Sequence, residues 1–294
     1  MEEPIRTHAA EPTPPADGID PTEAAEAAAA ARRYRRRSFA AAFGYLGIYL
    51  GTQIVLILPF TVLVIMRAVM EYAGDMDAVL AAVTATVADK AILLTAASGA
   101  LTVVVLWILF ACRKKRFLSE ISLLPLRGRP VWPVLLIGIC ANLSVSGVLS
   151  LLPAHWLQSY SDISTMLLGE ISPLLVLFVV LLAPVVEEIV FRGLIYTRLR
   201  RALPRIAALL LASLLFGLLH EHPVWIAYTF VLGLLLNLIF DWYGSLLAPI
   251  CLHLAFNGAS FLSLLTEGLP VIAVIGVSLP ACVALLVYIR RKTA

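Results

Sequence analysis

One stretch of sequence, APVVEEIVFRG at residues 183–193, decides how the rest of the chain is interpreted. It ends a run that is otherwise Leu, Val and Phe from Leu174 onward, and it contains Glu187, Glu188 and Arg192. On insertion scales, each such charge costs about 2.5–3.5 kcal/mol at the centre of a membrane helix. Charges placed so close together in an apolar run therefore need partners, water or a chemical role to offset that cost.

Helical spacing separates the two glutamates. Glu188 and Arg192 are four residues apart, so they lie on one face of a helix and can form an ion pair. Glu187 points about 100° away around the helix and has no partner within the stretch. Because a buried carboxylate without a partner becomes more basic, Glu187 is suited to general-base catalysis. We therefore predict Glu187 as a catalytic base, and we interpret Glu188 and Arg192 as a supporting ion pair.

The composition indicates a membrane protein. Of the 294 residues, 61% are hydrophobic and 14% are charged, and the mean hydropathy is +0.94. Soluble domains carry roughly 25% charged residues, so we predict an integral protein of the cell membrane. The four cysteines lie inside apolar runs, which is typical of small buried side chains, and the sequence has no CxxC metal motif.

Eight apolar stretches approach or exceed the length of about 20 residues that a helix needs to cross a bilayer. They occupy residues 39–66, 91–112, 131–153, 173–192, 206–220, 223–240, 245–265 and 269–289. We therefore predict an all-α, polytopic membrane protein with about eight transmembrane helices over residues 39–289. The candidate site would lie between the C-terminal helices, and residues 290–294 would form a short cytoplasmic tail.

Residues 1–38 differ in composition from the rest. Pro, Ala, Glu and Asp dominate, and the segment ends in a basic cluster from Arg32 to Arg37. Because it lacks the apolar content to build a core, we predict a disordered tail with at most a short helix from Thr22. The basic cluster is typical of an anchor beside a first membrane span, and we expect no nucleic-acid partner.

The positions of Lys and Arg predict the orientation in the membrane. If the spans alternate, the basic clusters fall on one side, at residues 32–37, 113–116, 198–205 and 290–292. The opposite loops are acidic. Because short loops rich in Lys and Arg face the cytoplasm, we predict that both termini are cytoplasmic.

Further polar groups lie in the C-terminal half of the membrane domain. Phe216 and His220 end the fifth span, and His253 and Asn257 lie four residues apart in the seventh. A single membrane histidine can serve merely as a hydrogen-bonding contact between helices. Two histidines at the depth of Glu187 favour a site instead, with Phe216 as packing support.

Counting residues from the turns gives that depth. Glu187 lies 17 residues before Pro204 and His220 lies 16 after it, so both stand roughly 25 Å up an antiparallel hairpin at 1.5 Å per residue. Asn257 lies 13 residues after Gly244, roughly 20 Å up its own helix. We therefore expect one polar layer within the membrane.

A carboxylate, two imidazoles and an amide favour hydrolysis by an activated water. The layer has no obvious Ser or Cys nucleophile, which argues against an acyl-enzyme. Glu187 would deprotonate a bound water that His220 orients. His253 and Asn257 would donate hydrogen bonds to the oxyanion of the tetrahedral intermediate. The layer therefore predicts peptide-bond hydrolysis inside the membrane.

The same residues carry a resemblance to a known family, in the ordered motifs Glu187-Glu188-x-x-x-Arg192, Phe216-x-x-x-His220 and His253-x-x-x-Asn257. They resemble the CPBP family of intramembrane glutamic endopeptidases (CAAX-processing and bacteriocin-protection, or Abi, proteins), which is related to the Ras-converting CAAX protease. The resemblance covers about residues 165–265 and implies an eight-helix fold with a water activated by Glu187 and His220. It also implies a peptide or membrane-protein substrate, in some members lipidated. Cleavage of CaaX tails, of peptide leaders and of membrane proteins all remain open.

Other interpretations also remain open. Glu187, His220 and His253 could be the His2Glu ligands of a catalytic zinc ion. The charges of Glu188 and Arg192 would disturb such a cation site, so the leading hypothesis includes no metal or other cofactor. A proton-coupled transporter would also carry Glu and His in the membrane, but the sequence shows no internal repeat. The last alternative is a non-catalytic immunity or scaffold protein.

Overall fold

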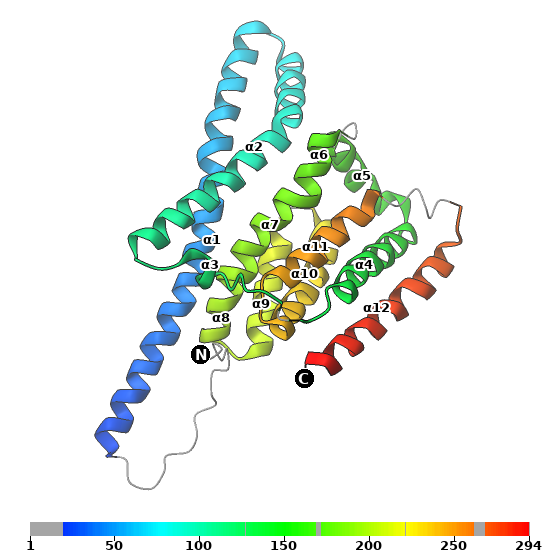
Figure 1. Cartoon of the computed structure of the whole chain (residues 1–294). Coiled ribbons are helices and arrows are strands. Elements are labelled where there is room, and N and C mark those ends of the chain that lie inside the picture. The colour runs from blue at the N-terminus through cyan, green and yellow to red at the C-terminus, as the bar shows by residue number, and fades with distance from the viewer. Residues whose placement is uncertain (1–19, 127, 169–171, 221, 262–267, 294) are drawn as a thin grey trace.

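The computed structural model describes residues 20–126, 128–168, 172–220, 222–261 and 268–293 (Figure 1). Helices fill most of these ranges and no strand occurs in them, which confirms the all-α prediction. Residues 1–19 of the predicted tail, the end of the seventh predicted span at 262–265 and residue 294 lie outside the described ranges.

Helices occupy all eight predicted stretches. In the part of the chain that the structure describes, six helical segments are long and apolar enough to cross a membrane: α1 (Pro21–Glu71), α2 (Met76–Cys112), α4 (Trp132–Ser150), the interrupted helix Pro173–Ala202, α10 (Pro223–Tyr243) and α12 (Val271–Thr293). Two shorter apolar helices are α9 (Arg205–Leu218) and α11 (Leu247–Ala259). The chain is a polytopic membrane protein, whereas the count of eight crossings stays a prediction.

Helix α1 begins much earlier than the sequence analysis predicted. The Asp20 side chain accepts a hydrogen bond from the backbone N–H of Thr22 at 2.9 Å, and Pro21 occupies the first helical turn, so the N-terminus is capped. The alanine-rich segment that follows has a high helix propensity. The predicted disordered tail is therefore wrong for residues 21–38, which continue into the first span as one helix.

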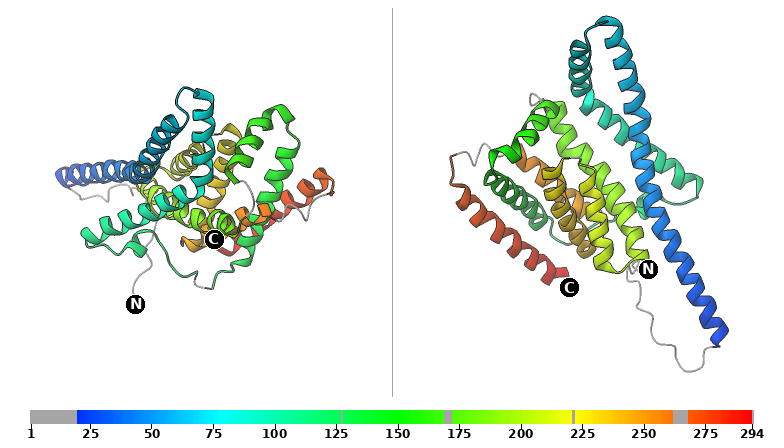
Figure 2. Two further views of the ribbon diagram at one scale, coloured as in Figure 1. Left: turned by 90° about the horizontal axis from the view of Figure 1, so that it is seen from above. Right: turned by 180° about the vertical axis from the view of Figure 1, so that it is seen from behind.

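Helices α1 and α2 form a hairpin beside the C-terminal bundle. A buried hydrogen bond joins Thr52 Oγ1 to Thr102 Oγ1 at 2.6 Å and holds the two helices together. At 1.5 Å per residue, α1 is about 75 Å long, more than twice the hydrocarbon thickness of a bilayer. Figure 2 shows that α1 extends beyond the bundle at both ends.

Small residues let the C-terminal helices pack closely. A Cβ atom added at Gly138 of α4 would stand 2.8 Å from the Ala255 side chain of α11. A Cβ atom at Gly233 of α10 would stand 3.1 Å from Ser213 of α9. A Cβ atom would clash at Gly138 and would be tightly packed at Gly233, so α11 and α9 approach their neighbours closely at these two positions.

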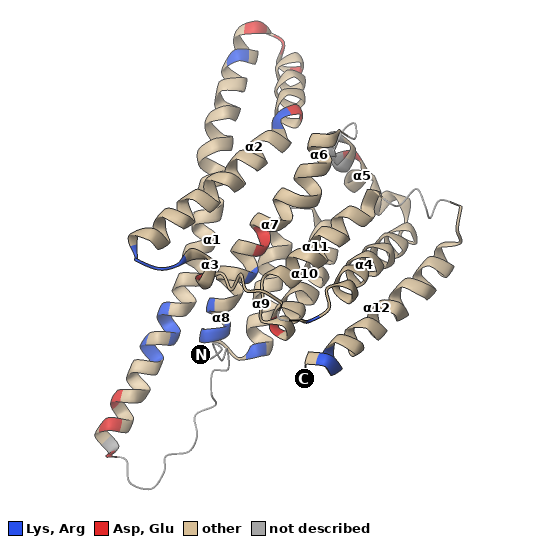
Figure 3. Cartoon of the chain, in the orientation of Figure 1, with Lys and Arg blue, Asp and Glu red and all other residues tan. Residues whose placement is uncertain are grey.

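Two further helices were not predicted. Helix α3 (Phe117–Glu120) follows the basic loop after α2, and α5 (Ala154–Leu168) lies between α4 and the interrupted helix. In Figure 3, Lys and Arg gather in the lower half of the molecule on α1, on α8 (Thr197–Ala202) and at the end of α12, and a further basic stretch follows α2 at mid-height. The acidic turn between α1 and α2 lies at the other end.

Candidate active site

The helix that carries the two glutamates is interrupted by π turns. Its parts are α6 (Pro173–Leu177), the π segment η1 (Phe178–Leu182), α7 (Ala183–Glu188), the π segment η2 (Ile189–Tyr196) and α8. Both glutamates lie on the short α7 between the two π segments. Such π insertions are rare in helices and are frequent at functional sites.

Pro184 explains the first interruption. Proline has no N–H group, and its ring would clash with the carbonyl group four residues earlier in a regular helix. In a π turn, residue 184 would donate to the carbonyl of Val179, so proline leaves that carbonyl without its helical donor. The side chain of Asn257 supplies a donor instead, with Nδ2 2.9 Å from the Val179 oxygen. This hydrogen bond ties α11 to the helix that carries the glutamates.

Glu188 lies at the centre of a buried charge network. Arg192 Nη1 donates to Glu188 Oε1 at 2.9 Å, so the ion pair expected from the spacing is formed. His253 Nδ1 lies 2.8 Å from the same oxygen. Because a carboxylate only accepts hydrogen bonds, Nδ1 carries the proton in this contact. All three side chains are almost fully buried.

The ring of Phe216 packs against Arg192 and against both histidines of the site. The guanidinium carbon of Arg192 lies 4.4 Å from the centre of its ring, a distance typical of cation–π contact. The ring also meets the imidazoles of His220 and His253 edge-on, at centroid distances of 5.1 and 6.0 Å. Phe216 thus contacts Arg192 and both histidines, and its supporting role stays a prediction.

Glu187 differs from Glu188 in being open to a cavity. Its side chain is 21% exposed, whereas that of Glu188 is fully buried. A cavity of about 270 Å³ is lined by Glu187 and His220, and by residues from α1 and α2. Glu187 also has a distant partner, since its Oε2 lies 3.8 Å from His253 Nε2. The structure therefore brings Glu187, His220 and His253 together, as the depth argument expected.

The orientation of His220 is set by its own helix. Nδ1 lies 3.0 Å from the carbonyl oxygen of Phe216, which can only accept, so Nδ1 carries the proton. In the neutral ring, Nε2 then has a free lone pair. A ring held in this way can accept a hydrogen bond from a water molecule in the cavity.

His253 and Asn257 have partners inside the protein. His253 contacts both glutamates, and Asn257 donates to Val179. Neither residue is among the described residues that line the cavity with Glu187 and His220. The arrangement therefore differs from the sequence expectation, in which both side chains faced the reacting carbonyl.

The comparisons with known proteins identify this region. Residues 169–259 match the family described as "Type II CAAX prenyl endopeptidase Rce1-like". This segment, about a third of the chain, is therefore similar to the Rce1-like family. It is also 35% identical over 92 residues to the "Membrane-embedded CAAX protease MroQ" of Staphylococcus aureus (strain USA300), a match that covers 29% of this chain and 37% of that protein. No solved structure matches the chain.

The Rce1-like segment does not include all of the site. Tyr49 and Gln53 of α1 and Thr95 of α2 line the cavity opposite α7, and all three precede the matched residues. The sequence analysis missed them. A signal was present, because Tyr49 and Gln53 are four residues apart and so place two polar groups on one face of an apolar helix.

The sequence analysis left open a zinc site with Glu187, His220 and His253 as ligands. Within the described ranges, no three His, Cys, Asp or Glu side chains are arranged as ligands of one metal ion. The buried contact between His253 Nδ1 and Glu188 occupies one imidazole nitrogen.

Proposed function

We propose that this chain is a membrane-embedded endopeptidase that hydrolyses a peptide bond with a water activated by Glu187. The observation that carries the proposal is the contrast between the two glutamates. Glu188 is neutralised in a buried network, whereas Glu187 opens onto a cavity that it shares with His220. Because the Glu187 carboxylate faces the cavity, it can accept a proton from a bound water, as a general base must.

The reaction follows from the two groups on the cavity. A water molecule hydrogen-bonded to His220 Nε2 gives a proton to Glu187, and its oxygen forms a bond to the carbonyl carbon of the substrate. The carbonyl electron pair moves to the oxygen and gives a tetrahedral oxyanion. When the oxyanion collapses, the C–N bond breaks, and Glu187 returns the proton to the leaving amine. The products are a carboxylic acid and an amine, with Glu187 restored.

The buried residues hold this arrangement in place. The Nδ1–H of His253 is fixed by Glu188, so its Nε2 faces Glu187 at 3.8 Å. In the protonated ring, that nitrogen donates to Glu187 and orients its carboxylate. Asn257 donates to Val179 and so holds α11 against the glutamate helix. These are the roles that we propose for His253 and Asn257.

The substrate class that we propose is a protein with a C-terminal CaaX sequence. The support is that both the matched family and the similar S. aureus protein are described as CAAX proteases. An apolar bundle also suits a substrate whose cysteine carries a prenyl group. Comparing the membrane proteomes of cells with wild-type and Glu187→Gln protein would reveal a different substrate class.

Purified full-length protein in detergent tests the proposal with a farnesylated fluorogenic CaaX peptide. We expect the wild type to cleave it and Glu187→Gln to lose about 10²–10⁴-fold in turnover while remaining folded, because a positioned general base contributes that much. A Glu187→Gln variant that turns over like the wild type would contradict the mechanism. A scaffold or immunity protein would keep its cellular phenotype after this substitution.

The same assay distinguishes a metal-free mechanism, in which Glu187 and His220 activate the water, from a zinc mechanism. We expect turnover to persist after treatment with a strong chelator. Activity that disappears with chelator and returns with added zinc would instead favour Glu187, His220 and His253 as zinc ligands.

A further inference from the structure

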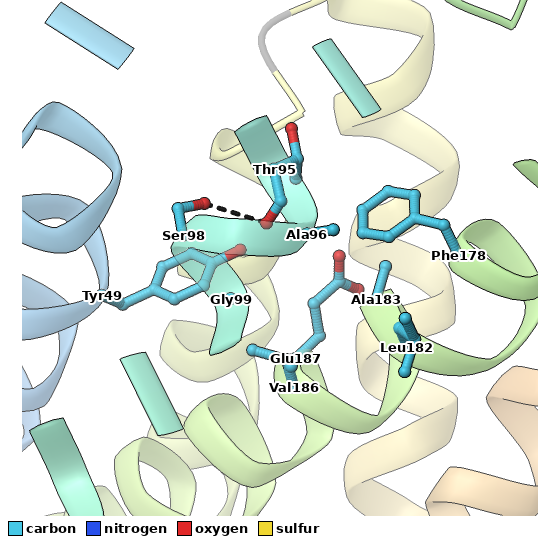
Figure 4. Close-up of a pocket in the computed structure, with 10 residues that line it drawn as sticks. All are labelled: Tyr49, Thr95, Ala96, Ser98, Gly99, Phe178, Leu182, Ala183, Val186 and Glu187. Carbon is cyan, nitrogen blue, oxygen red and sulfur yellow. Dashed lines mark hydrogen bonds between the residues drawn. The ribbon is translucent and has the colours of Figure 1, made fainter. Parts of the chain in front are cut away.

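The wall of the cavity that faces the glutamate helix is built from α1 and α2. Tyr49, Thr95 and Glu187 line both the larger cavity and a smaller one of about 30 Å³ beside it. Figure 4 shows the phenol of Tyr49 and the carboxylate of Glu187 reaching into the same pocket from different helices. A group bound at Glu187 is therefore within the space that the Tyr49 hydroxyl also faces.

Packing fixes the position of Tyr49. Its ring meets Phe191, on the glutamate helix, edge-on at a centroid distance of 6.0 Å. Helix α2 approaches α7 closely, because a Cβ atom at Gly99 would already stand 3.4 Å from the Val186 side chain. The hairpin is thus held against the Rce1-like segment by direct contacts, so the Tyr49 hydroxyl has a defined place in the site.

Two other hydrogen-bond donors near the cavity are already engaged. The hydroxyl of Thr95 donates to the carbonyl of Ala91 at 2.8 Å, and the Nδ1–H of His253 is directed at Glu188. Gln53 lies one turn from Tyr49 on α1 and lines the same cavity. Tyr49 is therefore a well-placed donor on the wall opposite Glu187.

We propose that Tyr49 donates a hydrogen bond to the carbonyl oxygen of the scissile peptide and stabilises the oxyanion formed there. This inference rests on the proposed endopeptidase function. During the step, the water oxygen bonds to the carbonyl carbon, the water proton goes to Glu187, and the carbonyl electron pair moves to oxygen. The phenol proton stays on Tyr49 throughout, so the hydroxyl acts only as a hydrogen-bond donor.

Tyr49→Phe removes the hydroxyl and keeps the ring that packs on Phe191. We expect kcat for the farnesylated CaaX peptide to fall by about 10²–10³-fold with KM nearly unchanged, because an oxyanion donor acts mainly in the transition state. The matched control is Tyr45→Phe. Tyr45 lies one turn earlier on α1, stacked on Phe110 at 5.9 Å, and does not line either cavity. The control should keep wild-type kcat and KM.

The outcomes separate this inference from the function on which it rests. A wild type that does not cleave the peptide, or a Glu187→Gln variant that is fully active, overturns both. If the wild type is active and Glu187→Gln is not, a Tyr49→Phe variant with wild-type kcat overturns this inference alone. A higher KM with unchanged kcat also overturns it, since the hydroxyl would then bind only the ground state. Melting temperatures and turnover per folded molecule exclude a loss that comes from misfolding.

Discussion

At the residue scale, the site depends on two adjacent carboxylates in different surroundings. Glu188 Oε1 accepts from both Arg192 and His253 in a fully buried position. Glu187 is partly exposed to a cavity and has only the longer contact to His253. The same functional group can therefore serve as a structural anchor at one position and as a base at the next.

The first prediction of this contrast concerns Glu188→Gln. The substitution leaves the Arg192 charge buried without its counter-charge, and removing one partner of a buried pair costs about 3–5 kcal/mol. We expect a lower yield and a lower melting temperature in detergent, with part of the turnover surviving in the folded fraction. Glu187→Gln is the matched comparison, and it should melt like the wild type. If Glu188→Gln is the stable, inactive variant, the two roles are reversed.

Sequence spacing could predict only the local part of this network. The pair between Glu188 and Arg192 follows from a separation of four residues on one helix. The contact between Glu188 and His253 joins residues 65 positions apart, so it depends on how α11 packs on the glutamate helix. For the same reason, the donation from Asn257 to Val179 was not predicted, although Pro184 marked the place where a carbonyl would lack its donor.

At the scale of elements, apolar runs predicted the positions of the helices but not their ends or interruptions. Hydropathy alone could not show that α1 starts at Pro21, because an alanine-rich segment with a cap forms a helix without an apolar face. The π segments beside α7 were also missed, although Pro184 was a sequence signal for the first of them. The apolar runs also did not show how the helices pack together, so the contribution of α1 and α2 to the cavity wall was not predicted.

A salt bridge anchors the small helix α3 to the glutamate helix. Arg198 Nη2 lies 2.6 Å from Glu120 Oε2, and Lys115 Nζ lies 2.9 Å from Glu120 Oε1. Burial by itself raises the pKa of Glu120, but the hydrogen bond from Lys115 and the charges of Arg198, Lys115 and Arg201 outweigh it and hold the pKa below its ordinary value. The ionised carboxylate is therefore favoured by folding.

This linkage predicts a pH dependence of stability. Because the pKa of Glu120 is lower in the folded state, its contribution is present above the ordinary glutamate value of 4.5 and is lost as the pH falls below it. We expect Glu120→Gln to lower the melting temperature at pH 7 and to reduce the further loss on going to pH 4. The control is Glu71→Gln, since the ion pair of Glu71 with Arg67 is exposed. Equal pH curves for wild type and Glu120→Gln would contradict the linkage.

At the scale of the whole molecule, the basic residues gather near one end (Figure 3). The first and last described helices both belong to this group, since α1 carries the cluster from Arg32 to Arg37 and α12 ends in Arg290, Arg291 and Lys292. Six long helical segments, or eight if α9 and α11 also cross, are even numbers of crossings. Either count puts the beginning of α1 and the end of α12 on the same side of the membrane.

The positive-inside rule makes that side the cytoplasm, which gives the last prediction. In a variant without the four native cysteines, single cysteines at Arg36 and Lys292 should react with a membrane-impermeant thiol reagent only after the cells are opened. Residues 36 and 292 are both exposed, so burial would not prevent the reaction. A cysteine at Asp77, in the first turn of α2 at the opposite end, is the matched control and should react in intact cells. Labelling of both 36 and 292 from outside would invert the orientation, and labelling of one alone would require an odd number of crossings.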